Sequence, residues 1–211
     1  MPSEIPEDFD KNIFINCPFD SGYWPLLRPL LFTIIYLGFN PKIGMERSDS
    51  GELRINKICE FIRISKYSIH DLSRLQSRKK REFYRMNMPF ELGIEYGCRR
   101  FSSNHLSEKR CLILEKSRHD YAKALSDLSG VDIKSHSNDP PKLILAVRSW
   151  FVETVGLRGV DSPTRIVYQF MNFMSDFHEK RTSAGFSDQD LEEMPVPEFM
   201  HFIQEWLQHQ N

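Results

Sequence analysis

The chain has 211 residues, of which 40% are hydrophobic, and its formal net charge is -1. This length fits one domain of ordinary size, alone or with a small appendage, and the hydrophobic content suffices for a real core. A nearly neutral charge gives no global electrostatic reason to expect nucleic acid or an anionic membrane as a partner.

Signals for secretion, membrane insertion or zinc binding are not evident in the sequence. The four cysteines are scattered and form no C-x-x-C pair, which disfavours a zinc site and is typical of reduced thiols in a cytosolic protein. The acidic N-terminus lacks the apolar stretch of a signal peptide. The most apolar run, at residues 24–39, is shorter than the ~20 residues of a membrane span and contains Arg28 and Pro29. We therefore expect a cytoplasmic protein that holds no metal and does not enter a membrane.

Short apolar runs alternate with longer amphipathic stretches as far as about residue 159. The short runs predict strands over 12–17, 40–44, 66–73, 110–115 and 131–136. The longer stretches predict helices over 24–39, 51–65, 88–101, 120–128 and 140–156. Strands that alternate with helices favour a parallel sheet with helices on both faces. Ligands bind such sheets at the carboxyl ends of the strands, so a site is expected among 17–23, 45–52, 70–74 and 86–91.

From about residue 160 the pattern changes to helices alone. Amphipathic helices are predicted over 164–180 and 196–208, and the turn-rich segment 182–190 separates them. We therefore expect an α/β domain over 1–159 and a helical appendage over 160–211. The appendage either packs back on the sheet or forms a surface for self-association or for a partner protein.

Two polar loops follow the first two predicted strands. In CPFDSGY, Asp20 either caps the next helix or faces a ligand. In GMERSDSGE, Arg47, Asp49 and Gly51 precede a helix whose first backbone N–H groups are free to bind an anion. The structural alternative is that Asp49 is simply an N-cap. Neither a P-loop nor a dinucleotide-binding fingerprint is present, so these loops match no standard phosphate motif.

The third predicted strand ends in HDLS, and a basic cluster follows it. His70 beside Asp71 is either a core histidine or part of a site, and the spacing alone favours the core. The RKKR cluster at 78–81 is more typical of a solvated loop than of a phosphate site.

Glu91 is the residue whose setting is hardest to explain structurally. It follows Pro89 and Phe90 and precedes Leu92, in what the sequence predicts to be the packed first turn of a helix. A carboxylate near a helix N-terminus gains roughly 0.3–1 kcal/mol from the helix dipole. That gain explains why Glu91 is tolerated but not why it stands in apolar surroundings, where glutamate is rarely buried without a partner. Glu91 is therefore the first candidate for a functional residue.

The order FIN…GF…MERSDSGELRINKICEFIRISKYSIHDLS…MPFEL resembles the TIR (Toll/interleukin-1 receptor) domain. The segment ELGIEYG is also similar to the corresponding helix of the nucleoside 2-deoxyribosyltransferases. The resemblance covers about residues 12–135 and implies a flavodoxin-like three-layer sandwich with a five-stranded parallel sheet. Asn87, Met88 and Pro89 depart from the TIR pattern, which commonly has a small residue, Trp and Cys there. The D-S-G-T that precedes the helix in the transferases is also missing before Glu91.

Both families cleave N-glycosidic bonds with a carboxylate on this helix, and Glu91 matches it. In TIR-type hydrolysis of NAD the glutamate contacts the ribose, and in the transferases it attacks the anomeric carbon. Either role suits a reaction through an oxocarbenium-like centre, which a nearby carboxylate stabilises or captures. The resemblance therefore implies that Glu91 is catalytic.

The resemblance also implies a pocket for a nucleotide or nucleoside. Its expected members are Phe19, Asp20, Tyr23, Arg47, Asp49 and Gly51, with His70 and Asp71 as further candidates from the third strand. We expect a bacterial TIR-like protein that cleaves the nicotinamide–ribose bond of NAD, a substrate and not a cofactor, in antiphage defence or signalling. The alternatives are base exchange or hydrolysis of nucleosides, and a non-catalytic nucleotide sensor or self-assembling scaffold.

Overall fold

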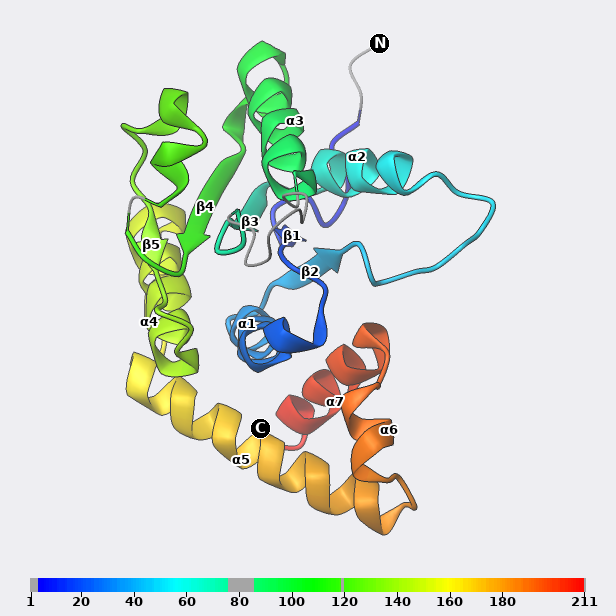
Figure 1. Ribbon diagram of the computed structural model, residues 1–211. Helices are drawn as coiled ribbons and strands as arrows, with labels where there is room; N and C mark the ends of the chain where they lie inside the picture. The colour runs from blue at the N-terminus through cyan, green and yellow to red at the C-terminus, as the bar shows by residue number, and fades with distance from the viewer. Residues whose placement is uncertain (1–3, 76–85, 119, 211) are drawn as a thin grey trace, which may run out of the picture.

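The computed structural model describes residues 4–75, 86–118 and 120–210, and its core is a five-stranded parallel sheet. The strands are β1 (Asn12–Asn16), β2 (Asn40–Ile43), β3 (Tyr67–Asp71), β4 (Arg110–Glu115) and β5 (Lys134–Ser135). They are ordered β2-β1-β3-β4-β5, and every neighbouring pair is parallel. The predicted α/β class and the flavodoxin-like sheet with C-terminal helices are therefore confirmed (Figure 1).

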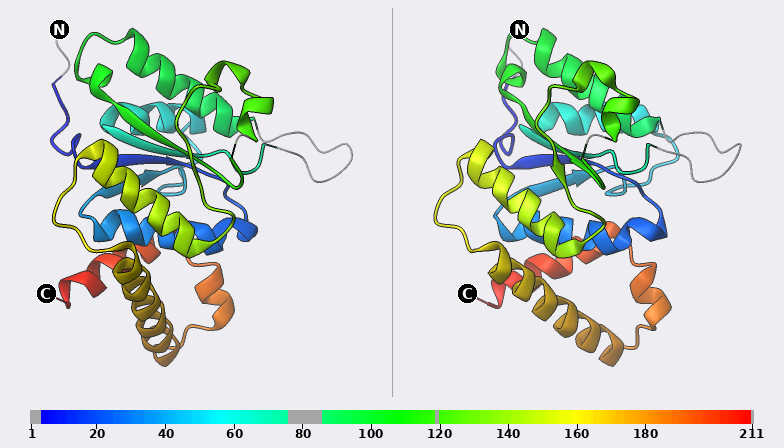
Figure 2. Two further views of the ribbon diagram at one scale, coloured as in Figure 1. Left: turned by 90° about the vertical axis from the view of Figure 1, so that its left-hand side faces the viewer. Right: turned by 60° about the vertical axis from the view of Figure 1, so that its left-hand side comes forward.

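Helices cover both faces of the sheet. The layer on one face consists of α1 (Trp24–Tyr36) and α4 (Pro140–Trp150), and that on the other of α2 (Arg54–Ile64) and α3 (Asn87–Phe101) (Figure 2). Residues of β1 contribute to the hydrophobic layers on both faces of the sheet, because successive side chains of a strand point to opposite faces. Ile13 and Ile15 pack in the cluster of α1 and α4, whereas Phe14 packs against α2. The apolar run that was too short for a membrane span is thus the buried helix α1.

Two predicted elements near β4 and β5 differ from the structure. The segment predicted as a helix over 120–128 forms two 3-10 turns, η3 (Tyr121–Lys123) and η4 (Ser126–Leu128). The Glu115 carboxylate accepts the Tyr121 backbone N–H, and the buried Tyr121 hydroxyl donates to the Leu128 carbonyl at 2.8 Å. These side-chain bonds close tight turns in place of an α-helix. The strand predicted over 131–136 shortens to Lys134–Ser135 because it is an edge strand that pairs only with β4.

The C-terminal segment is helical, as predicted. It forms α5 (Pro163–Ser183), α6 (Asp188–Glu192) and α7 (Val196–Gln208), and the short α6 begins within the segment predicted to be turns. A capping box between Ser187 and Asp190 explains why that helix begins there. Of these helices, α5 packs on α1 and α4, α7 packs on α1 and α5, and α6 contacts α5 (Figure 1). Among the residues that the structure describes, no helix has both the length and the apolar content needed to cross a membrane.

Phe32 of α1 joins the appendage to the rest of the core. Its side chain is fully buried, and its ring centroid lies 5.5 Å from that of Phe170, 5.5 Å from that of Phe173 and 6.1 Å from that of Trp206. Residues before and after position 160 therefore share one continuous hydrophobic cluster.

Replacing Phe32 by alanine is expected to lower the free energy of unfolding by about 3–5 kcal/mol, because it opens a cavity where the aromatic rings meet. Urea denaturation followed by circular dichroism measures the change. Phe101→Ala is the control: that side chain is 86% exposed, so its removal should cost less than about 0.5 kcal/mol. A similar loss in both variants would contradict the role assigned to Phe32.

Candidate functional site

Three carboxylates gather around Cys17 at the carboxyl end of β1. The thiol is fully buried, and its pKa is raised well above its usual value, first by burial and then by the charges of Asp71, Glu91 and Asp20. The three carboxylates come from the end of β3, from α3 and from the loop after β1. Negatively charged groups therefore lie close together at the edge of the sheet where a site was expected. Their mutual repulsion is relieved when positively charged side chains lie nearby.

Glu91 receives its positive partner from α2. Its side chain is only 5% exposed, and Oε1 accepts a hydrogen bond from Arg54 Nη2 at 3.1 Å. Oε2 is buried and has no hydrogen-bond partner among the described residues. Glu91 is the fifth residue of α3 and so lies just past the first turn, where the helix dipole weakens. The ion pair with Arg54, more than the dipole, therefore accommodates the carboxylate.

Arg54 is itself held by the neighbouring loops. The centre of its guanidinium lies 5.2 Å from the ring centroid of Phe19, which is a cation–π contact. A Cβ atom at Gly44 would lie 3.1 Å from Arg54 Nη1, so glycine leaves the space that the guanidinium needs. Arg54 thus contacts both Phe19 and Glu91, so the structure connects the predicted site residue Phe19 to Glu91 only through this arginine.

Burial raises the pKa of Glu91, and the charge and hydrogen bond of Arg54 offset only part of that effect. The carboxyl group therefore ionises at a higher pH than an ordinary glutamate. A carboxylate with a raised pKa at a sheet edge is suited to charge stabilisation or proton transfer.

Replacing Arg54 by glutamine is expected to raise the pKa of Glu91 further, because burial then acts without the opposing positive charge. The carboxyl carbon shift of Glu91, followed by NMR against pH, measures the change. Arg63→Gln is the matched control, since Arg63 is an exposed arginine of the same helix. Titration of Glu91 at the same pH in the Arg54 variant and the wild type would show that the ion pair has no effect.

Asp20 pairs with an arginine from the loop after β3. It stands at the N-cap of the turn η1 (Ser21–Tyr23), but its side chain caps no backbone N–H there. Both of its carboxylate oxygens instead accept hydrogen bonds from Arg74 Nη1. A Cβ atom at Gly22 would lie 3.0 Å from Arg74 Nη2, so glycine permits this close approach. The alternative that Asp20 is a helix cap is therefore wrong.

Asp71 is the centre of a buried network of polar contacts near Cys17. It accepts a hydrogen bond from the Tyr23 hydroxyl at 2.5 Å and one from the Ser73 backbone N–H at 2.8 Å. Nε2 of His136, which follows β5, lies 3.1 Å from Asp71 Oδ2. The Asn138 backbone N–H donates to His136 Nδ1 at 3.0 Å, so Nε2 is the ring nitrogen that faces Asp71. The predicted residues Tyr23 and Asp71 thus bond to each other within the protein.

The pKa of Asp71 follows from this network. Burial by itself raises it, but the contacts with His136, Ser73 and Tyr23 outweigh burial and hold the pKa below the usual range of aspartate. Asp71 is therefore ionised at neutral pH, and its buried charge organises the loops around β1, β3 and β5.

His70 lies on the opposite face of β3 from Asp71, since neighbouring strand residues point to opposite sides. It is fully buried, and its Nδ1 lies 3.0 Å from Asn16 Nδ2. Burial and the charge of Lys109 lower the pKa of His70 to about 3, so the ring is neutral at physiological pH. His70 is therefore buried in the core, and its Nε2 has no hydrogen-bond partner among the described residues. Asn16 also donates to the Met88 carbonyl at 2.8 Å and so ties the start of α3 to β1.

Arg47, Asp49 and Gly51 lie in the loop between β2 and α2, which projects away from the sheet (Figure 1). Arg47 bonds to Glu52 at 2.7 Å and to Glu60 at 2.6 Å, and not to Glu91. Asp49 Oδ1 accepts the Gly51 backbone N–H at 2.8 Å, forming an exposed Asx turn. Because α2 begins only at Arg54, the N-cap interpretation of Asp49 is wrong. The basic cluster at 78–81 lies outside the described residues.

The residues that the sequence interpretation missed are Cys17, Arg54, Arg74 and His136. One signal pointed to the arginines, because a buried carboxylate requires a positively charged partner. The sequence offers several arginines near this edge and does not distinguish among them.

The described part of the chain contains no group of three or more His, Cys, Asp or Glu side chains arranged to hold a metal ion. Comparison with protein-family models, with curated proteins and with solved structures finds no match to this chain. The geometry around Glu91 is therefore the basis for inferring a function.

Proposed function

We propose that this protein cleaves the N-glycosidic bond of a nucleotide, with Glu91 as the catalytic carboxylate and NAD as the substrate. The observation that supports it most is the state of Glu91: one oxygen is bonded to Arg54, and the other has no hydrogen-bond partner in the described residues. The other two carboxylates of the cluster have partners, since Asp20 binds Arg74 and Asp71 binds Tyr23. Glu91 is thus the carboxylate of this cluster with one oxygen that no described residue engages.

In the proposed reaction the bond between the ribose C1′ and the nicotinamide nitrogen breaks, and its electron pair leaves with the base. The Glu91 carboxylate stabilises or captures the positive charge that develops at C1′. Water then adds its oxygen to C1′ and loses a proton. Burial strengthens the charge interaction because the local dielectric constant is low, and Arg54 holds the carboxylate in place.

The charge of the leaving group favours NAD over a neutral nucleoside. The nicotinamide ring of NAD is cationic, so it departs as a neutral molecule and needs no proton from the protein. A nucleoside such as deoxyadenosine requires protonation of its base as the bond breaks. One ionised carboxylate beside the sugar, as at Glu91, is therefore sufficient for NAD.

We also propose that the protein is a cytoplasmic effector that acts after self-association. All four cysteines are free thiols, which suits a reducing compartment. Two large apolar side chains of α5, Tyr168 and Met171, are 62% and 59% exposed, and exposed apolar groups favour protein contacts. A specific activity that rises with protein concentration is the expected sign of such association.

Purified protein incubated with NAD, over a range of protein concentrations, should release nicotinamide and ADP-ribose in equal amounts, measured by chromatography. A parallel reaction contains deoxyadenosine and a second free base. Base exchange without cleavage of NAD would replace the proposal by the transferase alternative. Nucleotide binding detected by calorimetry, with no product in either reaction, would instead support the non-catalytic sensor.

A further inference from the structure

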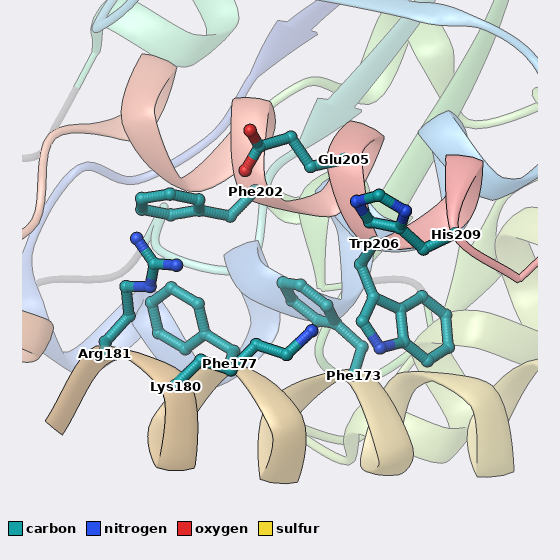
Figure 3. Close-up of a pocket in the computed structure, with 8 residues that line it drawn as sticks. All are labelled: Phe173, Phe177, Lys180, Arg181, Phe202, Glu205, Trp206 and His209. Carbon is teal, nitrogen blue, oxygen red and sulfur yellow. The ribbon is translucent and has the colours of Figure 1, made fainter. Parts of the chain in front are cut away.

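A cavity lies between α5 and α7, on the far side of α1 from the sheet. Its volume is about 150 Å³, and Figure 3 shows the side chains that line it. Four are aromatic (Phe173, Phe177, Phe202 and Trp206) and two are cationic (Lys180 and Arg181). An aromatic cavity with cations at its rim is a chemically distinct surface from the carboxylate cluster around Glu91.

The aromatic wall of this cavity is rigid because it is part of the core. Phe173, Phe177 and Trp206 are only 1%, 5% and 6% exposed, and the rings of Phe173 and Trp206 meet edge to face at 5.7 Å. Trp206 Nε1 donates to Asp176 Oδ2 at 2.8 Å, which fixes the orientation of the indole. A preformed wall lowers the entropic cost of binding. A cavity of this size lined by apolar groups accommodates about one benzene ring.

The rim of the cavity carries the positive charges of Lys180 and Arg181. Arg181 lies over the ring of Phe202, with its guanidinium centre 4.2 Å from the ring centroid. The Lys180 side chain runs beside Phe177 towards Phe173 (Figure 3). Within the described residues neither cation forms an ion pair. Guanidinium edges and a free ammonium group are the donors that bind carboxylates.

We propose that this cavity binds a small aromatic carboxylate that has a single ring. The ring contacts Phe173, Phe177 and Trp206, and the carboxylate binds Lys180 and Arg181. Glu205 also lines the cavity, and its Oε1 lies 3.3 Å from Nε2 of His201. Its negative charge disfavours a second anionic group on the ligand, so the site selects a monoanion.

Benzoate is the probe, and the indole N–H signal of Trp206 in a proton–nitrogen NMR spectrum is the readout. Benzoate should shift this signal saturably, while the signals of Trp24 and Trp150 stay in place. Benzamide has the same ring without the charge, and acetate has the charge without the ring. Both should bind at least about 10-fold more weakly, since each lacks one half of the recognition. Equal binding of benzamide, or no saturable shift with benzoate, would overturn the proposal.

Variants that remove a charge from the cavity test the same contacts, and the expected change in benzoate affinity depends on the sign of the charge removed. Lys180→Gln and Arg181→Gln should each weaken benzoate binding about 5-fold, because each removes a partly exposed charge-assisted contact. Glu205→Gln should strengthen binding, which a partly unfolded variant would not do. Lys142→Gln, at an exposed lysine of α4, is the matched control and should leave the affinity unchanged. Benzoate affinity that is unchanged in both cation variants would also overturn the proposal.

Discussion

Replacing Glu91 by glutamine is expected to lower the rate of NAD cleavage by about 1,000-fold, the size of effect seen when a charge-stabilising group is removed from an active site. Glutamine keeps the shape of the side chain and removes the negative charge that the reaction needs. The release of nicotinamide, measured by chromatography under single-turnover conditions, gives the change directly.

The same substitution is expected to leave the fold intact or to stabilise it. Burial makes the folded pKa of Glu91 higher than the unfolded one, so the folded state favours the protonated carboxyl. The free energy of unfolding therefore falls as the pH rises from the unfolded pKa through the folded pKa, and the whole penalty is present above both. Glutamine removes this penalty, so at neutral pH the variant should be as stable as the wild type or up to about 1 kcal/mol more stable.

Glu60→Gln is the matched control for this experiment. Glu60 belongs to an exposed carboxylate–arginine pair, with Arg47, on the same side of the sheet. Its loss should cost less than about 1 kcal/mol and leave the cleavage rate unchanged. A Glu91 variant that retains activity would remove this residue from the mechanism. A clearly destabilised variant would show that the carboxylate has a structural role.

Replacing Asp71 by alanine is expected to lower the free energy of unfolding by about 3 kcal/mol, since it leaves buried donors without an acceptor. The Tyr23 hydroxyl and the Ser73 backbone N–H donate to Asp71, and His136 Nε2 lies 3.1 Å from its Oδ2. Urea denaturation at neutral pH measures the loss. Tyr23→Phe is the matched control, because it removes one hydrogen bond and should cost only about 1–2 kcal/mol. A loss below about 1 kcal/mol in Asp71→Ala would show that the network is unimportant.

The pH dependence of stability should also change in the Asp71 variant. The folded pKa of Asp71 is lower than the unfolded one, so its stabilisation is present above the unfolded pKa and is lost as the pH falls through the folded pKa. Because an unfolded aspartate has a pKa of about 4, the wild type should lose this stabilisation below about pH 4. The difference in stability between wild type and Asp71→Ala should therefore shrink on acidification.

Local sequence patterns predicted most of the fold, because they depend on interactions between near neighbours. Buried strands such as β4 appear as short apolar runs, and α4 begins at a proline pair behind Asp139, whose side chain caps the helix. The exceptions are the η3–η4 segment and β5. There the burial of Tyr121 and the position at the sheet edge override local preference.

The candidate site, like the fold, could be predicted only in part from the sequence. Glu91 could be recognised from the sequence by itself, because an isolated carboxylate among apolar residues stands out wherever the chain folds. The partner of Glu91 could not be recognised in the same way, because Arg54 is 37 positions away in the sequence. Arg47 was an equally plausible partner from the sequence, but in the structure it pairs with Glu52 and Glu60.

The apolar periodicity of the sequence by itself determined the alternation of strands and helices, and with it the edge of the sheet where Glu91 lies. Only the tertiary structure decided the charge pairing at that edge. Asp71 and His70 are adjacent in sequence, yet their side chains point to opposite faces of β3. Asp71 contacts Tyr23 and His136, whereas His70 is buried on the other face of the sheet. Arg54, which pairs with Glu91, also lies close to Gly44 and over the ring of Phe19. Such contacts join residues distant in sequence, and their energies depend on burial and distance that no local pattern contains.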